Sequence, residues 1–528
     1  MTSHRIRPVT LLLSLAPLAA CYATHDPLII TGDDSGSEDG SESGSTAPTT
    51  TAGDPTTASD TSADTSASTT VSTSATDDTG PTDTGDSTAD GSTTDTGPIC
   101  GDGMIEGDEV CDDGVNDGSY GGCLADCTDL GPHCGDGVEQ GDEVCDDGDE
   151  VNGDGCNVDC IVSGSELWTQ TFAGAADEND IVYAVAVGPD DYIVAVGSEG
   201  LGSGTRQAWI QRYASDGAED WNEIYPGASG ANTEASGVAI DDEGGVYVAG
   251  RYDGLTEEMN GWVRKYDDSA ALEYTHLFNG AVDGGDRVWG VAVSPDGYAA
   301  LAGVVDTNAG VDAWVRRLGQ DGTEFWTRTQ TGVTNAHANA IDSDGSIVAV
   351  GTTDGGDIWV RKYDQDGGTI WTRTYDGGST DNGLAVAIDD SGRIAVLGNT
   401  IEGIGVDIWV RQYDADGATL WSDTYDSTND GGFVGDYATG IAVDSHANVL
   451  VTAGTPSDDS MSMLAWVRKY TEDGAELWTQ SWHVGVPVDA AYTYASAVAV
   501  DSSDNIIVGG AEALDSTVND CWVRKLAP

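Results

Sequence analysis

The feature that most constrains this chain is a short motif that recurs seven times. Each copy is a segment of the type Trp-Val-Arg-Lys-Tyr, and successive copies lie roughly fifty residues apart, a period typical of solenoids, propellers and other arrays of one small unit. A repeat of this kind copies the same scaffold contacts into every unit. The copies are AWIQRY (208–213), GWVRKY (261–266), AWVRRL (313–318), IWVRKY (358–363), IWVRQY (408–413), AWVRKY (465–470) and CWVRKL (521–526).

Three further short segments accompany each copy. They are a WTxTY type, as in EFWTRTQ (324–330), an AVAVD type, as in AVAID (385–389), and an IxVxG type, as in IAVLG (394–398). Alternating apolar residues over such lengths are typical of β-strands. Four short strands in each of seven units predict an all-β fold, a seven-bladed β-propeller with four-stranded blades.

The repeat begins in the middle of a unit. Its first segment is ELWTQTF (166–172), of the WTxTY type, and no such segment follows the last motif at 521–526. We therefore predict that 166–172 forms the outer strand beside 521–526, so that an N-terminal strand closes the ring and leaves no unpaired edge. The AVAVD-type strands are predicted to be innermost, because one face bears only Gly or Ala where space near an axis is limited.

The order of these segments resembles that of NHL repeats and of the bacterial seven-bladed (SBBP-like) propeller repeats, over nearly all of 166–528. The resemblance implies the fold and a binding role. It does not imply a particular reaction.

The N-terminus has the features of an export signal. Arg5 and Arg7 precede the apolar run VTLLLSLAPLAA, which is too short to span a bilayer. Residues 18–21, Leu-Ala-Ala-Cys, resemble a bacterial lipobox, which implies cleavage before Cys21 and lipidation of that residue. Tyr22 is not the aspartate that retains such lipoproteins at the inner membrane, which favours an outer-membrane location. The alternative is an ordinary signal peptide with an incidental cysteine.

Composition divides the rest of the chain into three parts. Residues 22–99 are nearly all Ser, Thr, Asp, Gly, Ala and Pro, which predicts a disordered acidic linker; 100–162 are rich in cysteine, and 163–528 contain the repeats. The chain has 92 Asp and Glu against 20 Lys and Arg, a formal net charge of −72. Such a charge excludes nucleic acid as a partner, and it leaves the lipid anchor as the only expected contact with a membrane.

Two matched units make up residues 100–162, and each contains CGDG, then GDEVCDDG, then C-x-x-x-C. They resemble a disulfide-rich repeat family of myxobacterial surface proteins. Two disulfides per unit are expected after export, but four cysteines allow three pairings. The cysteines are Cys100, Cys111, Cys123, Cys127, Cys134, Cys145, Cys156 and Cys160.

Metal binding in these units is the competing interpretation. The cysteine spacings match zinc sites poorly. The run 147–153, Asp-Gly-Asp-Glu-Val-Asn-Gly, nearly fits a calcium-binding EF-hand loop, although Asn152 comes one residue late and Val158 stands in place of the closing Glu. Calcium is therefore the one cofactor that stays open, and Asp-Gly turns without metal are the alternative.

Most of the charged residues that recur from one copy of the repeat to the next have a structural explanation. Twelve of the eighteen Lys and Arg of 163–528 occupy the Arg and Lys positions of the motif, and Asp ends five of the seven AVAVD-type strands. We expect these residues to form a repeated Arg–Asp pair, because repeats copy scaffold contacts. The solitary Cys521 is expected to be buried packing.

A ligand site is expected instead where the repeat is broken. Trp289 and His337 lie near the starts of two predicted inner strands, with Tyr183 at the matching place in the first unit, and Asn339 replaces the Val or Ile of the other copies. Together with the Asp-rich loops at that end, they could hold a sugar, a cationic group or calcium. The alternative is variation on a solvated rim, with a hydrogen-bonded polar group in the core.

No catalytic motif is found in the sequence. The prediction is a monomeric, non-catalytic binding module for a protein or a glycan, anchored by lipid in the outer membrane and exposed to the periplasm or the outside. Two alternatives stay open: a hydrolase or lyase that acts on polysaccharide, and a structural component of an envelope assembly.

Overall fold

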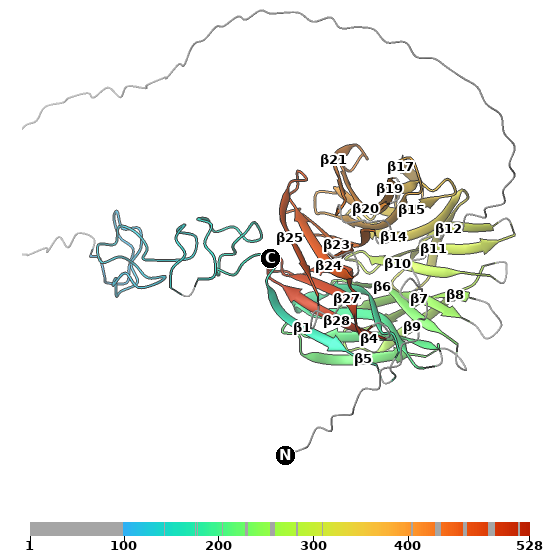
Figure 1. Ribbon diagram of the computed structural model, residues 1–528, viewed down its shortest axis with the longest axis horizontal. Coiled ribbons are helices and arrows are strands. Elements are labelled where there is room, and N and C mark those ends of the chain that lie inside the picture. The colour runs from blue at the N-terminus through green and yellow to red at the C-terminus, as the bar shows by residue number, and fades with distance from the viewer. Residues whose placement is uncertain are drawn as a thin grey trace, which may run out of the picture. The chain divides into compact units, whose positions relative to one another are not determined.

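The structure is a computed structural model that describes residues 99–528 apart from 142, 175, 177, 203, 227–230, 254–258, 281–283, 309, 403–404, 428–434, 458–461, 484–491 and 516–517 (Figure 1). The predicted signal peptide, Cys21 and nearly all of the linker lie outside these residues. Within the described part of the chain, no helix is both long enough and apolar enough to cross a membrane.

Apart from one 3-10 turn, Pro189–Asp191, the regular elements of the described residues are β-strands. Twenty of them form five antiparallel sheets of four consecutive strands. These are β2 (Ile181–Val187), β3 (Ile193–Gly200), β4 (Arg206–Tyr213) and β5 (Glu219–Tyr225); β6 (Thr233–Ile240), β7 (Val246–Asp253), β8 (Met259–Tyr266) and β9 (Leu272–Phe278); β10 (Arg287–Val293), β11 (Ala299–Thr307), β12 (Gly310–Leu318) and β13 (Glu324–Gln330); β14 (Val333–Ile341), β15 (Ile347–Thr353), β16 (Ile358–Tyr363) and β17 (Thr369–Tyr375); β18 (Asn382–Ile388), β19 (Ile394–Glu402), β20 (Gly405–Tyr413) and β21 (Thr419–Tyr425).

The other eight strands form one sheet with two halves. One half is β22 (Tyr437–Val443), β23 (Val449–Pro456), β24 (Met463–Tyr470) and β25 (Glu476–Trp482); the other is β26 (Tyr492–Val500), β27 (Ile506–Asp515), β28 (Val518–Leu526) and β1 (Glu166–Phe172). A single parallel bridge, Met463 with Tyr492, joins them. β1 pairs antiparallel with β28, with Gln170 opposite Val523, which confirms the predicted pairing of 166–172 with 521–526.

The two chain segments that meet at β1 and β28 together reproduce a turn of the repeat. Ala527 N–H donates to Ser165 O (2.8 Å) and Gly164 N–H to Ala527 O (3.2 Å). In the continuous turn between β4 and β5, Ala214 and Gly217 make the same two bonds, at 2.8 and 2.9 Å. Gly164 has φ +75°, and an added Cβ would lie 3.1 Å from Gln480 Cγ. The junction is therefore a split turn, in which the positive φ and the close packing around Gly164 favour glycine.

Neighbouring sheets contact each other through their first strands, which are the AVAVD-type segments, as predicted. The contacts run from β2 to β6, β10, β14, β18, β22 and β26, and β26 contacts β2. Apolar clusters fill the space between sheets, and the motif Trp residues are buried in them. Indole N–H groups of the WTxTY-type strands also donate to turn carbonyls of the next sheet: Trp168 to Ser215, Trp326 to Gln365, Trp371 to Ala415 and Trp421 to Glu472.

The prediction of a repeated Arg–Asp pair is wrong, because the cation that pairs with the Asp is the motif lysine. In three repeats the Asp that ends the first strand pairs with the motif lysine, and both side chains are buried. Neighbouring residues of a strand point to opposite faces, so the motif arginine faces away from this Asp. In two of these three repeats it pairs instead with a Glu at the start of the adjacent outer strand, whereas Arg361 of the third donates to Thr372 and Gln330. The lysine pairs are Lys362–Asp342 (2.8 Å), Lys469–Asp444 (3.0 Å) and Lys525–Asp501 (2.7 Å), and the arginine pairs are Arg468–Glu476 and Arg524–Glu166.

Two repeats that lack this Asp use a different contact. β2 and β10 are followed by Gly188 and Ser294, and the motif lysine is replaced by Arg212 and Arg317. Their guanidinium carbons lie over the rings of Tyr192 (3.8 Å) and Tyr298 (4.8 Å). A cation–π contact therefore replaces the buried ion pair, which avoids an uncompensated charge.

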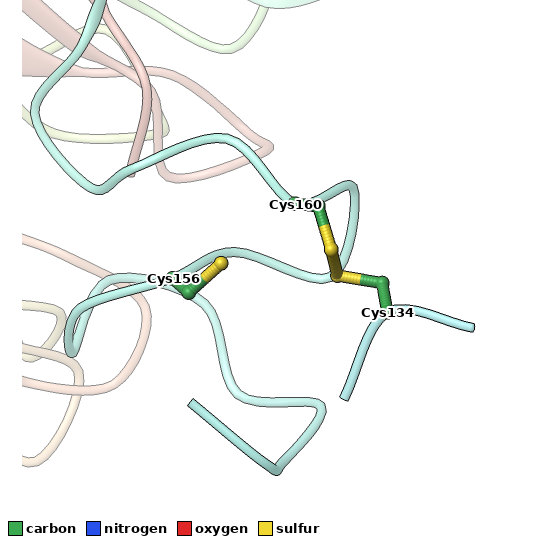
Figure 2. Close-up of side chains that lie close together, drawn as sticks. All are labelled: Cys134, Cys156 and Cys160. Carbon is green, nitrogen blue, oxygen red and sulfur yellow. A yellow bond between two sulfur atoms is a disulfide. The ribbon is translucent and has the colours of Figure 1, made fainter. Parts of the chain in front are cut away.

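Disulfides hold the two cysteine-rich units, as expected, and their pairing is nested. The first cysteine of each unit pairs with the fourth and the second with the third: Cys100–Cys127, Cys111–Cys123, Cys134–Cys160 and Cys145–Cys156. Figure 2 shows Cys134 bonded to Cys160, with Cys156 nearby. The thiols are consumed and cannot serve as zinc ligands. Cys521 is free and buried, as predicted.

Candidate functional site

Each first strand carries a β-bulge near its start, where one extra residue interrupts the pairing with the second strand. In β10 the register shifts between Val288 and Gly290, which leaves Trp289 as the extra residue. Bulges re-aim side chains and are frequent at functional sites. The seven bulge residues are Tyr183, Ser236, Trp289, His337, Leu384, Thr439 and Ser496.

Three bulge residues are small and tie neighbouring sheets together. Each hydroxyl donates to a backbone carbonyl in the first strand of the next sheet: Ser236 to Val288 O (2.7 Å), Thr439 to Ala495 O (2.8 Å) and Ser496 to Val182 O. A bulge side chain therefore points towards the following sheet. The other four repeats have a larger side chain at the bulge.

Trp289 and His337 stack on each other across two sheets. Their ring centroids are 5.5 Å apart and the planes are parallel within 1°. The guanidinium carbon of Arg287 lies 5.2 Å from the centre of the Trp289 ring. Trp289 is buried, whereas His337 is half-buried. The structure thus joins two of the predicted site residues into one aromatic pair with a cation beside it.

Asn339 lies in the same interface and has a structural role. Its Nδ2 donates to Ala300 O (2.9 Å), and its Oδ1 lies against Gly290, where a Cβ would come within 3.0 Å. Tyr183 is separate from the aromatic pair, because it lies on β2, where it interacts electrostatically with Arg251. Burial lowers the pKa of Arg251, but its acidic neighbours, Glu234 above all, raise it, and the net shift is upward.

The Asp residues just before the first strands are buried and anchor loops. Asp180 accepts backbone N–H groups from Gly174 and Gly200, and Asp436 accepts from Ser427 (2.7 Å). Burial raises the pKa of both carboxyls to about 6. Asp286 and Asp381 are buried in the same way. These carboxylates were expected to line an open mouth, but they are buried, and each accepts at least one N–H of the loop backbone. Asp177, Asp283 and Asp430 lie outside the described residues.

Sequence reasoning missed a group of charges at this end. Arg206 and Arg251 both pair with the buried Glu234, at 3.1 and 2.7 Å. With Arg287 they are three of the six Lys and Arg of 163–528 that lie outside the motif. Because these three arginines lie outside the motif, the sequence could have revealed them as departures from the repeat.

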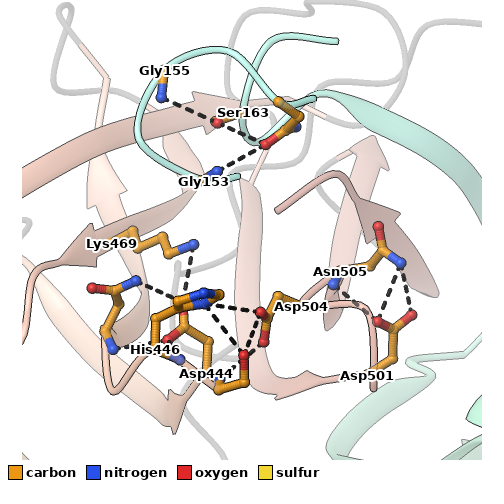
Figure 3. Close-up of polar contacts among 12 residues, drawn as sticks. Gly153, Gly155, Ser163, Asp444, His446, Lys469, Asp501, Asp504 and Asn505 are labelled. Carbon is orange, nitrogen blue, oxygen red and sulfur yellow. Dashed lines mark hydrogen bonds and ion pairs between the residues drawn. The ribbon is translucent and has the colours of Figure 1, made fainter. Parts of the chain in front are cut away.

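Ser445, His446 and Asp504 form a second polar cluster, after the opposite ends of the first strands (Figure 3). Ser445 Oγ donates to Asp504 Oδ2 (2.6 Å), and both atoms lie near His446 Nδ1, at 3.2 and 3.1 Å. A catalytic triad needs the serine and the carboxylate on different ring nitrogens. The same contact recurs between Ser502 and Asp191, so the cluster is a repeated contact between sheets.

Three carboxylates converge in the segment that resembles a calcium-binding loop. Oxygens of Asp147, Asp149 and Asp154 lie within 4.8 Å of one another, and all three residues are exposed. Asn152 is turned away, because its Oδ1 accepts the N–H of Val158 (2.9 Å). These three side chains could hold a calcium ion, and no EF-hand ligand order is reproduced.

Comparison with known proteins places the repeats in a fold class. Residues 224–251, from β5 to β7, match the model of the SBBP β-propeller repeat. The scaffold is a β-propeller.

Curated proteins provide no match. Similar solved structures include the WD40 domain of Neurospora crassa Pan2 (9% identity, TM-score 0.43, covering 68% of this chain and 95% of that chain) and Chaetomium thermophilum Raptor (11%, 0.44, 69% and 29%). A protein of unknown function from Bacteroides caccae is also similar (12%, 0.36, 54% and 93%).

Proposed function

We propose that the chain is an exported lipoprotein whose seven-bladed propeller is a non-catalytic binding module for a protein partner. The blade count is supported by five four-stranded sheets and an eight-stranded sheet whose halves share one bridge. The return of the contact series from β26 to β2 supports a closed ring. Cys21 would carry the lipid, and 22–99 would hold the folded part of a monomer away from the outer membrane.

The stacked pair of Trp289 and His337 carries the proposal for the site. The two rings occupy bulge positions, where other repeats have a hydroxyl that closes a scaffold bond, and a guanidinium lies beside them. Aromatic and arginine side chains are the residues that contribute most to binding at protein interfaces. We infer that a partner approaches the end of the propeller at which the first strands begin.

The polysaccharide hydrolase is the weaker candidate. It needs a carboxylate with a raised pKa that can reach a substrate. The pKa values of Asp180 and Asp436 are raised, but both side chains are buried and hold loop backbone.

Capture from solubilised envelope extract tests the proposed function. The full chain is compared with the Trp289→Ala and His337→Ala variants, and with Ile370→Ala, a control that removes an exposed side chain at the other end of the sheet that carries His337. A protein that binds the wild type and the control in a dose-dependent way, and binds both site variants at least tenfold more weakly, supports the proposal. Equal capture by all four chains, or no saturable partner, overturns it. Labelling with a radioactive fatty acid tests the anchor, which Cys21→Ser should abolish.

A further inference from the structure

The sheet of β10 to β13 has a shallow cavity, open to solvent, at the end opposite to Trp289. It measures about 540 Å³ and lies between the turn after β10 and the turn after β12. Its lining is Asp296, Tyr298, Gly319, Gln320, Asp321 and Phe325. The cavity shares no residue with the site proposed above, so it is a separate candidate.

Phe325 gives this cavity an exposed aromatic surface. Its side chain is 57% exposed, and its ring centroid lies 5.7 Å from that of Tyr298. The guanidinium carbon of Arg317 lies 4.8 Å from the centre of Tyr298 but 5.9 Å from that of Phe325. Arginine therefore covers the tyrosine more closely, and the phenylalanine is the ring that stays available to solvent.

Polar groups surround this ring. Asp321 Oδ1 accepts the N–H of Thr323 (2.9 Å), and hydrogen bonds with Thr323 lower the pKa of this carboxyl, which is therefore ionised at neutral pH. Asp296 and Gln320 complete the polar side, and both are exposed; the amide nitrogen of Gln320 donates to Asp296 O. An ionised carboxylate accepts hydrogen bonds from hydroxyl groups, and the amide oxygen of Gln320 can accept as well.

The other repeats lack this combination. The strand position of Phe325 holds the exposed aliphatic residues Leu167, Ile370 and Leu420 on β1, β17 and β21. The related cavity of about 390 Å³ beside Tyr192 has Asp220 at this position, and Asp220 pairs with Arg212 at 3.0 Å. A tyrosine–arginine pair with an exposed aromatic ring beside it therefore occurs at Phe325, where the repeat departs from its pattern.

We propose that this cavity, between Phe325 and the carboxylates of Asp296 and Asp321, is a binding site for a neutral sugar. The C–H face of a sugar ring packs on an exposed aromatic face, while its hydroxyls donate to carboxylates and amides at the edge. The two carboxylates disfavour an anionic ligand, and the guanidinium of Arg317 offsets one of their two negative charges, which weakens the attraction for a cationic ligand. A neutral polyhydroxylated ligand fits both conditions.

Calorimetric titration of the full chain with neutral hexasaccharides tests this site. The probes are the hexamers of glucose in β-1,4 and α-1,4 linkage, of xylose and of N-acetylglucosamine, and the cationic glucosamine hexamer is titrated beside them as a charged comparison. At least one is expected to bind, with affinity reduced about tenfold by Phe325→Ala, the loss of a stacking contact worth a little over 1 kcal/mol. Ile370→Ala removes an exposed apolar side chain at the same strand position and is the matched control, and Asp321→Asn should weaken binding severalfold.

Three results would overturn the proposal: no binding of any neutral hexamer, equal affinity for wild type and Phe325→Ala, or binding of the glucosamine hexamer alone, which is cationic. An unchanged melting temperature shows that each variant is folded. The protein partner proposed for Trp289 and His337 should bind Phe325→Ala normally, so the two proposals fail independently.

Discussion

The buried ion pair of Lys469 and Asp444 leads to a quantitative prediction. Each side chain is 1% exposed, and Lys469 Nζ lies 3.0 Å from Asp444 Oδ2. Asp444 Oδ1 also accepts the N–H groups of His446 and Asn448, at 2.9 and 2.8 Å. Lys469→Met keeps most of the apolar stem but leaves the carboxylate buried without its cation. Breaking such a pair typically costs 3–5 kcal/mol, so we expect a loss of about 4 kcal/mol in the free energy of unfolding.

The matched control is Lys265→Met, at the same position of another repeat. Lys265 pairs with Glu273 at 2.9 Å, but the Glu273 side chain is 44% exposed, so water can solvate the carboxylate when the lysine is removed. Exposed pairs contribute about 0–1 kcal/mol. The difference between the two variants therefore isolates the effect of burial.

Denaturant unfolding of both full-length variants measures the two free energies. The double variant Asp444→Asn/Lys469→Met keeps an oxygen that can accept the N–H groups of His446 and Asn448 and removes the buried charge, so it should recover a large part of the lost stability. With the single variants Lys469→Met and Asp444→Asn it completes a double-mutant cycle, which gives the coupling energy of the pair. A cost for Lys469→Met no greater than that for Lys265→Met, or a double variant as unstable as Lys469→Met, would show that the buried carboxylate does not need its cation.

Three further outcomes follow from the structure. Gly164→Val should lower the melting temperature by several degrees more than Gly202→Val, because both glycines have positive φ but the space around Gly202 is open, and equal losses would contradict the split turn. Burial raises the pKa of Asp436 from 3.8 to about 6, so the folded state binds this proton more tightly than the unfolded state and its contribution to stability grows as the pH falls through 6 towards 4. Asp436→Asn should remove that part of the pH dependence of the melting temperature, and an unchanged profile would contradict it. Calcium should bind with a dissociation constant in the millimolar range typical of extracellular sites and lose affinity in Asp149→Asn, whereas equal heats for both chains would exclude the Asp147 cluster.

The strands could be predicted because the repeat displays them seven times, and the offset of its first segment was enough to place 166–172 beside 521–526. Pairing of the disulfides could not be predicted, because spacing leaves three choices in each unit. The lysine partner of Asp444 could not be predicted either. Arg468 and Lys469 are adjacent on β24 and point to opposite faces of the sheet, and the sequence does not show which of the two faces Asp444.

The candidate site was predicted in part for similar reasons. Trp289 and His337 were recognisable as breaks in a repeat, and the structure stacks them. Their bulges depend on register, which one strand's sequence does not contain. Asp180 and Asp436 look like polar rim residues in sequence, because nothing there reveals that loop N–H groups fold over them.

Hydrogen exchange of the full chain, with and without its captured partner, tests whether the partner binds at Trp289 and His337. The partner should slow exchange in 287–293 and 333–341, the strands β10 and β14 that carry these two residues. The turns after the first strands of the same sheets should change little. Protection confined to those turns or to the cysteine-rich units, with β10 and β14 unaffected, would show that the partner binds elsewhere.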